Sequence, residues 1–236
     1  DEAHNLVERG RQMYSAELCK EDFLAVKKLV KGEAPRFAKR LEACNKILLA
    51  MKKECENYKV LENISHFGIQ LMNVLSETDR YLEECVDKEV RETVLDFYFQ
   101  VRSFLNIYDG LDENYVVYTE YQENGRFVLK LFCVNPAANL QKCLDKGIST
   151  VFFSATLLPL KYYSRLLSTR KENFGMYVES PFEQKNRCLL ICRDVSSRYT
   201  RRGYEEYRKI AEYIARMSWQ KKGNYMAFFP SYKLMD

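Results

Sequence analysis

The sequence predicts an α/β protein interrupted by a large, all-helical insertion, and three observations support this fold class. Residues 12–108 contain almost no turn-forming residues apart from two short stretches, which favours long helices. Two β-rich runs follow, and the Asn-Gly pair between them is a strong hairpin signal. Apolar strand-like runs then alternate with amphipathic segments as far as residue 229, which is typical of α/β folds.

The composition indicates a globular chain. Its 236 residues are 47% hydrophobic, enough to bury the core of one large domain or two small ones. It has no apolar stretch of about 18 residues and no signal-peptide pattern, so we expect a cytoplasmic protein. Residues 1–111 hold 17 Lys or Arg against 20 Asp or Glu, whereas residues 112–236 hold 20 against 13. A surface that binds phosphate backbone is therefore expected in the second half.

The eight cysteines contain no Cys-x-x-Cys pair. We therefore expect reduced and mostly buried thiols rather than a metal or disulfide framework. Cys188 and Cys192 are four residues apart on an expected strand, and we do not expect them to form a paired site.

Two heptad seams indicate helices that pack against each other. A third amphipathic segment, from about Ile64 to Leu82, would complete an antiparallel bundle. Packing inside one domain is preferred over a coiled coil with a partner, because each seam ends within a few turns. The first seam comprises Phe37, Leu41, Cys44, Leu48, Met51, Cys55 and Tyr58, and the second Val90, Val94, Phe97, Val101, Phe104 and Tyr108.

After Gly110 the hydrophobic period changes from that of a helix to that of a strand. We expect a hairpin, a helix, a buried parallel strand, and then a β-α-β unit with a right-handed crossover. These elements are the hairpin strands Tyr115–Tyr121 and Phe127–Cys133, the helix from Pro136 to about Leu144, the strand Ile148–Phe153, and the strand, helix and strand Cys188–Cys192, Tyr204–Trp219 and Tyr225–Phe229.

Two short motifs carry the candidate chemistry. In the first, Asp1-Glu2-Ala3-His4, one carboxylate can hold Mg²⁺ while its neighbour orients or deprotonates a water molecule. The second, Ser154-Ala155-Thr156, follows an expected strand. The simpler interpretations are a solvated chain end, a surface histidine at His4, and a Ser/Thr pair that merely ends a strand.

A basic loop is the candidate nucleic-acid contact. Arg193, Arg198, Arg201 and Arg202 alternate with hydroxyl-bearing residues before an expected helix, and such groups can bind backbone phosphates. A merely solvated basic loop is the alternative. Ser231 and Tyr232 lie at the end of the last expected strand, where they could contact a backbone or stack on a base.

Four motifs in one order resemble those of the XPD/DinG family of superfamily-two ATP-dependent DNA helicases, over nearly the whole chain. They are Asp1 to Leu6 (the Walker B or DEAH box), Phe153 to Leu157 (motif III), Glu179 to Phe182, and Asn224 to Tyr232 (motif IV). The resemblance implies partial RecA-like P-loop NTPase motor domains with a helical arch inserted between the first two motifs.

The resemblance also implies a domain division and residue roles. Residues 1–11 would end the first motor domain, 12–110 would form the arch, 111–178 would return to the first motor domain, and 179–236 would begin the second. Asp1 would reach Mg²⁺ bound to ATP, Glu2 would activate water, and His4 would link the nucleotide site to the DNA-binding side. Ser154, Ala155 and Thr156 would form the coupling motif. The partner would be single-stranded DNA, with movement from 5′ to 3′.

The family often carries a 4Fe-4S cluster, whose ligands fall upstream of the Walker B box, so none of these cysteines is assigned to it. The chain opens on the tetrad, contains no Gly-x-x-x-x-Gly-Lys-Ser/Thr loop, and ends before the motif that would supply the family's arginine finger. It is therefore expected to be a fragment that hydrolyses no ATP by itself. The alternative is a non-catalytic nucleic-acid-binding or assembly module on the same scaffold.

Overall fold

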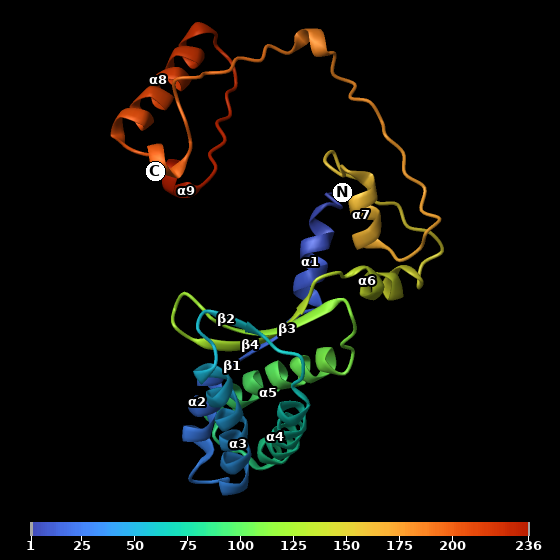
Figure 1. Ribbon diagram of the computed structural model, residues 1–236, viewed down its shortest axis with the longest axis vertical. Helices are drawn as coiled ribbons and strands as arrows, with labels where there is room; N and C mark the ends of the chain where they lie inside the picture. Colours follow the sequence, from blue (N-terminus) through green and yellow to red (C-terminus); the bar gives the residue numbers. More distant parts are fainter. Residues whose placement is uncertain (1, 236) are drawn as a thin grey trace. The chain divides into compact units, whose positions relative to one another are not determined.

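The computed structural model describes residues 2–235, apart from the side chain of Lys233. The chain forms two compact units, Asp1–Gly175 and Met176–Asp236, and each is described by itself. Figure 1 shows the first unit as a helical bundle covered by a small sheet, followed by a group of shorter helices.

The first unit contains seven α-helices and four strands among its described residues. The helices are α1 (Asn5–Met13), α2 (Lys20–Val30), α3 (Pro35–Lys53), α4 (Ser65–Glu84), α5 (Lys88–Tyr108), α6 (Ala137–Leu144) and α7 (Leu160–Leu167). The strands are β1 (Ala16–Cys19), β2 (Tyr58–Val60), β3 (Tyr115–Tyr121) and β4 (Phe127–Cys133).

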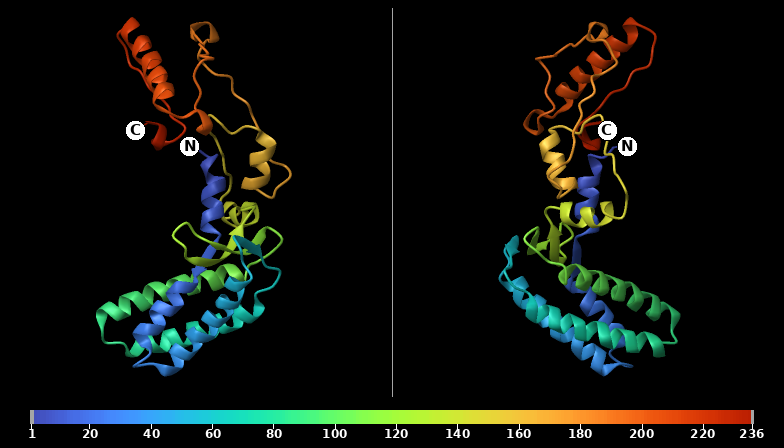
Figure 2. Two further views of the ribbon diagram at one scale, coloured as in Figure 1. Left: turned by 60° about the vertical axis from the view of Figure 1, so that its left-hand side comes forward. Right: turned by 90° about the vertical axis from the view of Figure 1, so that its right-hand side faces the viewer.

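The expected antiparallel bundle is present as α3, α4 and α5, with α2 packed against α3 and α5 (Figure 2). Local signals place the helix starts: Pro35 opens α3, and the Asp87 carboxylate accepts hydrogen bonds from the first backbone N–H groups of α5. In the first seam the residues from Phe37 to Leu48 are buried. Cys55 and Tyr58 lie beyond the end of α3, so the helical interpretation of those two positions was wrong.

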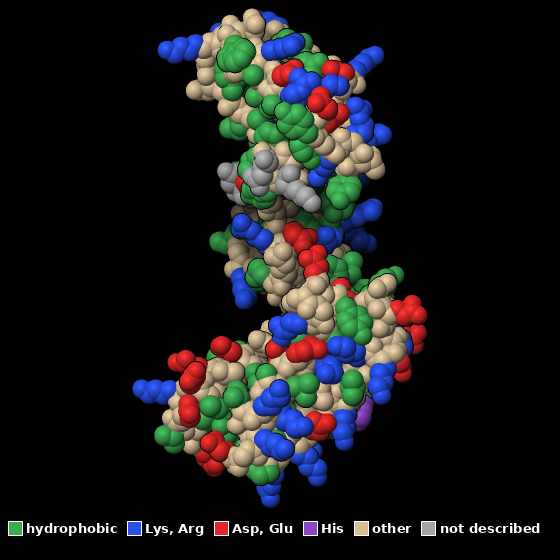
Figure 3. All heavy atoms as spheres, turned by 90° about the vertical axis from the view of Figure 1, so that its left-hand side faces the viewer, with side chains coloured by type: hydrophobic (Ala, Val, Ile, Leu, Met, Phe, Trp, Pro, Cys, Tyr) green, Lys and Arg blue, Asp and Glu red, His purple; other side chains and the backbone are tan. Residues whose placement is uncertain are grey.

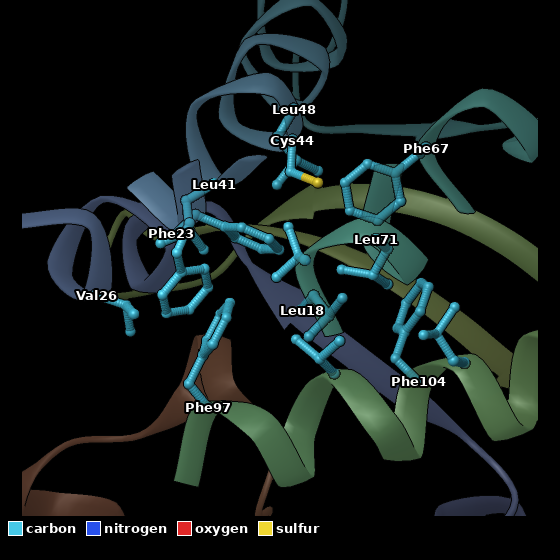
Figure 4. Close-up of a cluster of buried hydrophobic side chains, with 14 of the residues drawn as sticks. Leu18, Phe23, Val26, Leu41, Cys44, Leu48, Phe67, Leu71, Phe97 and Phe104 are labelled. Atoms are coloured by element: carbon cyan, nitrogen blue, oxygen red, sulfur yellow. The ribbon is translucent and has the colours of Figure 1, made fainter. Parts of the chain in front are cut away.

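The bundle core is built around aromatic side chains (Figure 4). Phe23 of α2 contacts Phe97 of α5 and Phe67 of α4 edge to face, with ring centroids 5.1 and 6.2 Å apart. Phe67 contacts Phe104 in the same way at 6.2 Å. Leu129 of the sheet joins this core. Helices and sheet therefore share one hydrophobic core.

The predicted hairpin is confirmed with the predicted bounds. β3 and β4 pair antiparallel, from Tyr115 opposite Cys133 to Tyr121 opposite Phe127. Gly125 has a φ of 77°, a left-handed conformation that glycine adopts without a steric cost. The Asn124 side chain accepts a hydrogen bond from the Arg126 N–H, which closes the turn.

The expectation of an all-helical insertion was wrong. β1 and β2 lie within residues 12–110, and they flank the hairpin in one antiparallel sheet with the order β1-β4-β3-β2. Both strands are three or four residues long, too short for a period-two pattern to stand out from the helical sequence around them. Their partners are distant in sequence: Leu18 lies opposite Leu129, and Lys59 opposite Thr119.

The remaining helices of the first unit form a smaller cluster. The predicted helix after Pro136 is confirmed as α6. Val7 of α1, Leu140 of α6 and Leu167 of α7 are buried together, with Phe152 and Leu157 packed around them.

The expected strand at residues 148–153 is absent. Ile148 and Val151 are exposed, and the segment has one backbone hydrogen bond to a distant part of the described chain, from the Ala3 N–H to the Phe153 carbonyl (3.2 Å). An apolar run becomes a strand only where neighbouring strands satisfy its backbone, and no strand of residues 2–175 lies alongside it.

The second unit contains α8 (Tyr204–Gln220), as predicted, with the short helices η1 (Gln184–Asn186), η2 (Tyr199–Arg201) and α9 (Tyr232–Met235). The two strands expected around α8 are absent, and their apolar side chains, Leu189, Leu190, Ile191, Met226 and Phe228, are exposed. The predicted β-α-β unit is thus wrong for the same reason, since nothing in the described part of this unit pairs with either run.

All eight cysteines are free thiols. Four are buried, but Cys143, Cys188 and Cys192 are exposed, so the expectation of mostly buried thiols holds only within the bundle and sheet. Among the described residues, no helix combines the length and apolar character needed to cross a membrane.

Candidate functional site

The two motifs of the candidate site meet although about 150 residues separate them. Ala3 is buried, and its N–H donates to the carbonyl of Phe153, directly before the Ser-Ala-Thr motif. The Asn5 N–H donates to the Glu2 carbonyl, and this turn leads into α1. Asp1, the predicted holder of Mg²⁺, lies outside the described residues.

Glu2 adopts an unusual backbone conformation. Its φ is 59°, in the left-handed region that non-glycine residues rarely occupy, at a cost on the order of 1 kcal/mol. Such strain persists only where the surrounding contacts impose it, and it is concentrated at functional sites.

His4 is the centre of the contacts between the motifs. Its Nδ1 lies 2.7 Å from Ser154 Oγ and 3.1 Å from Thr156 Oγ1. The same nitrogen lies 3.1 Å from Glu2 Oε2. Ser154 Oγ also accepts a hydrogen bond from the Thr156 N–H at 3.3 Å, which holds the two hydroxyls on one side of the loop. Ala155 lies between them and is exposed.

This arrangement allows exchange of hydrogen-bond partners. A hydroxyl can donate or accept, a carboxylate only accepts, and Nδ1 does one or the other according to its tautomer. A protonated Nδ1 can donate to Glu2 or to either hydroxyl, and an unprotonated one can accept from Ser154 or Thr156. If His4 Nδ1 loses or gains its hydrogen bond with Glu2, its hydrogen bonds with Ser154 and Thr156 can change as well. A change in those two hydroxyls can affect the contact with Glu2 in the same way.

A pocket of about 280 Å³ lies beside this contact. Glu2 and Arg9 are its charged lining residues, and Phe152 and Phe153 are among the apolar ones. Within residues 2–235 no group of three or more acidic, His or Cys side chains could hold a metal ion.

The segment that follows the Ser-Ala-Thr loop is anchored by a buried amide. Gln141 of α6 accepts hydrogen bonds from Ser168 Oγ (2.7 Å) and from the Thr169 N–H (3.2 Å), and donates to Asp145 (2.8 Å). Hydrogen bonds from Gln141 and Arg170 lower the pKa of Asp145. This network fixes the C-terminal end of α7 against α6.

The predicted basic loop lies in the second unit, and its arginines differ in their contacts. Arg201 pairs with Glu206 at 3.2 Å, and the same carboxylate accepts from the Ser196 N–H. Arg202 donates to the Ser197 carbonyl and lies over the Tyr199 ring at 5.6 Å. Two of the arginines therefore organise the loop.

The other two arginines are available for a ligand. Arg193 and Arg198 are exposed, and their side chains form no salt bridge or hydrogen bond with the described residues. Of the two residues predicted after the last strand, Ser231 has a buried Oγ without a partner among the described atoms, and Tyr232 is 83% exposed.

A basic surface on α2 and α3 was not predicted, because charge summed over each half of the chain hides it. Residues 20–53 alone hold ten Lys or Arg against four Asp or Glu, a net charge of +6. Counting charge helix by helix would have found it.

Comparison with known proteins gives a distant relationship. No model of a known protein family matches this chain. Over its whole length the chain is 23% identical to the ATP-dependent DNA helicase XPD of Sulfolobus acidocaldarius, and it spans 41% of that protein. The chain is thus a distant XPD-like relative, with the mixed helix and strand content of an α/β protein.

Proposed function

We propose that this chain is part of an ATP-dependent DNA helicase that couples ATP hydrolysis to 5′ to 3′ movement on single-stranded DNA. The observation that carries the proposal is the contact of His4 with Ser154 and Thr156, at 2.7 and 3.1 Å. A helicase must convert a change at a nucleotide into movement of another part, and this contact connects the two motifs through exchangeable hydrogen bonds. The distant XPD relative supports the same class of activity.

In this proposal Asp1 holds Mg²⁺ on ATP and Glu2 activates the attacking water. His4 transmits the change in the nucleotide site on ATP hydrolysis to Ser154, Ala155 and Thr156, which form the coupling motif. Residues 12–110 form the arch, residues 1–11 and 111–178 belong to the first motor domain, and residues 179–236 begin the second. Arg193 and Arg198, with Ser231 and Tyr232, contact the DNA strand, while Arg201 and Arg202 shape the loop. A 4Fe-4S cluster, if the parent protein holds one, takes its ligands upstream of this chain.

The test uses the full-length helicase of which this chain is proposed to be a part, here called the parent protein, with the substitution Glu2→Gln. Loss of a general base lowers the rate by about 10²- to 10⁴-fold, so DNA-stimulated ATP hydrolysis should fall by that factor. Glu8→Gln is the matched control, because Glu8 is a nearby exposed carboxylate paired with Arg11 on α1. Hydrolysis that persists in Glu2→Gln would contradict this role. The chain by itself should hydrolyse no ATP.

The alternative is a nucleic-acid-binding or assembly module on the same scaffold, without turnover. The same assay separates the two functions. DNA binding by a parent protein that hydrolyses no ATP at all would favour the module.

A further inference from the structure

The outward surface of α2 and α3 carries a dense set of cations. We call it the α2–α3 basic surface; it consists of Lys28, Lys31, Arg36, Lys39, Arg40, Lys46 and Lys53, all exposed. Figure 3 shows Lys and Arg side chains gathered over this part of the first unit. The segment from α4 to α5, residues 65–108, has the opposite sign, with four Lys or Arg against eight Asp or Glu, a net charge of −4.

Few charges of this surface act inside the protein: after the hydrogen bond from Lys27, the charge of Lys46 helps to lower the pKa of Glu42. The acidic residues nearby are paired with other lysines: Lys27 Nζ lies 2.6 Å from Glu42 Oε2, and Lys52 Nζ lies 3.3 Å from Glu21 Oε1. No side chain of the basic surface forms a salt bridge or hydrogen bond with any described residue. Cations without an ion-pair partner in their own fold raise the local potential and attract an anionic partner.

The spacing of these cations suits a long, regular polyanion. Lys39, Lys46 and Lys53 are seven residues apart, which places them on one face of α3, opposite the buried side of the helix. At 1.5 Å per residue they span about 21 Å, the length of roughly six base pairs of duplex DNA. The Lys27–Glu42 pair joins α2 to α3, so Lys28 of α2, and Lys31 directly after this helix, lie near the same row.

The surface lacks the groups that bind single strands. Sites for single-stranded nucleic acid combine cations with exposed aromatic rings on which bases stack. The exposed large hydrophobic side chains of α2 and α3 are Leu29 and Leu49, and their aromatic residues, Phe23 and Phe37, are buried. Because two packed helices hold the backbone of these residues, the cations recur at regular intervals along α3, which suits the repeating phosphates of a duplex.

We propose that the α2–α3 basic surface binds the phosphate backbone of duplex DNA, without reading its sequence. This contact lies outside the candidate nucleotide site and requires no ATP hydrolysis. A test of duplex binding by this surface is therefore independent of a test of the proposed helicase activity.

The test measures binding of the chain to a fluorescein-labelled duplex of about 20 base pairs, and to a single strand of the same length, by fluorescence anisotropy between about 50 and 200 mM salt. The test variant is Lys39→Gln with Lys46→Gln and Lys53→Gln. The matched control is Lys88→Gln with Lys146→Gln and Lys171→Gln, three exposed lysines on other segments, which changes the net charge equally. Far-UV circular dichroism verifies that both variants fold.

The test variant should lose about tenfold or more in duplex affinity, and its slope of log affinity against log salt should become shallower by about 2 to 3, near 0.9 for each lost phosphate contact. The control should retain both. Unchanged duplex binding by the test variant, or an equal loss in the control, would overturn the proposal. An equal loss on single strand and duplex would overturn the assignment to duplex DNA.

Discussion

Removing both hydroxyls that face His4 should loosen the contact between the two motifs. The perturbation is Ser154→Ala combined with Thr156→Val. Each hydroxyl lies within hydrogen-bond distance of His4 Nδ1, at 2.7 and 3.1 Å, so either one alone can retain part of the interaction. A partly exposed hydrogen bond contributes on the order of 1 kcal/mol net. The single variants should therefore each lose less than about 1 kcal/mol, and the double variant about 1 to 2 kcal/mol.

Hydrogen exchange followed by mass spectrometry measures the free energy of opening the contact between the two motifs. The Ala3 N–H is protected by the Phe153 carbonyl, so peptides that cover residues 2–7 and 150–158 report opening of the contact. A loss of 1 to 2 kcal/mol should speed exchange there by about 5- to 30-fold, while peptides from α4 should not change. The matched control is Ser149→Ala with Thr150→Val, which makes the same chemical changes in the same segment at exposed residues. Unchanged exchange in the Ser154 and Thr156 double variant would refute the structural role of this contact.

Two further predictions concern titration and thiol reactivity. The hydrogen bond from Lys27 lowers the pKa of Glu42, so its contribution to stability is present above the ordinary value of about 4.3 and is lost as the pH falls through the lowered value. Acid unfolding of Glu42→Gln followed by circular dichroism should lack this component; an unchanged acid profile would contradict it. Burial raises the pKa of Cys44 to about 12, so Cys44 should not react with a thiol reagent near neutral pH in the folded chain, whereas the exposed Cys143, Cys188 and Cys192 should react rapidly. Peptide mapping after a short labelling time checks the order, and early labelling of Cys44 would contradict it.

The elements whose backbone hydrogen bonds form between nearby residues could be predicted from the sequence. The heptad seams predicted α3 and α5, and Asn124-Gly125 predicted the hairpin with its bounds. These elements satisfy most of their backbone hydrogen bonds within themselves or across a short turn, so nearby residues specify them. The apolar runs at residues 148–153, 188–192 and 225–229 looked equally strand-like. A strand needs neighbours, however, and those runs have none among the described residues.

By itself, the sequence was enough to predict α3 to α6, α8 and the hairpin. Only the tertiary structure decided which residues meet. It placed His4 against Ser154 across 150 residues, joined β1 to β4, and set the lysines of α3 on an outward face beside those of α2. Residue type and short spacing are local properties, whereas a contact between distant segments depends on how the whole chain packs its core.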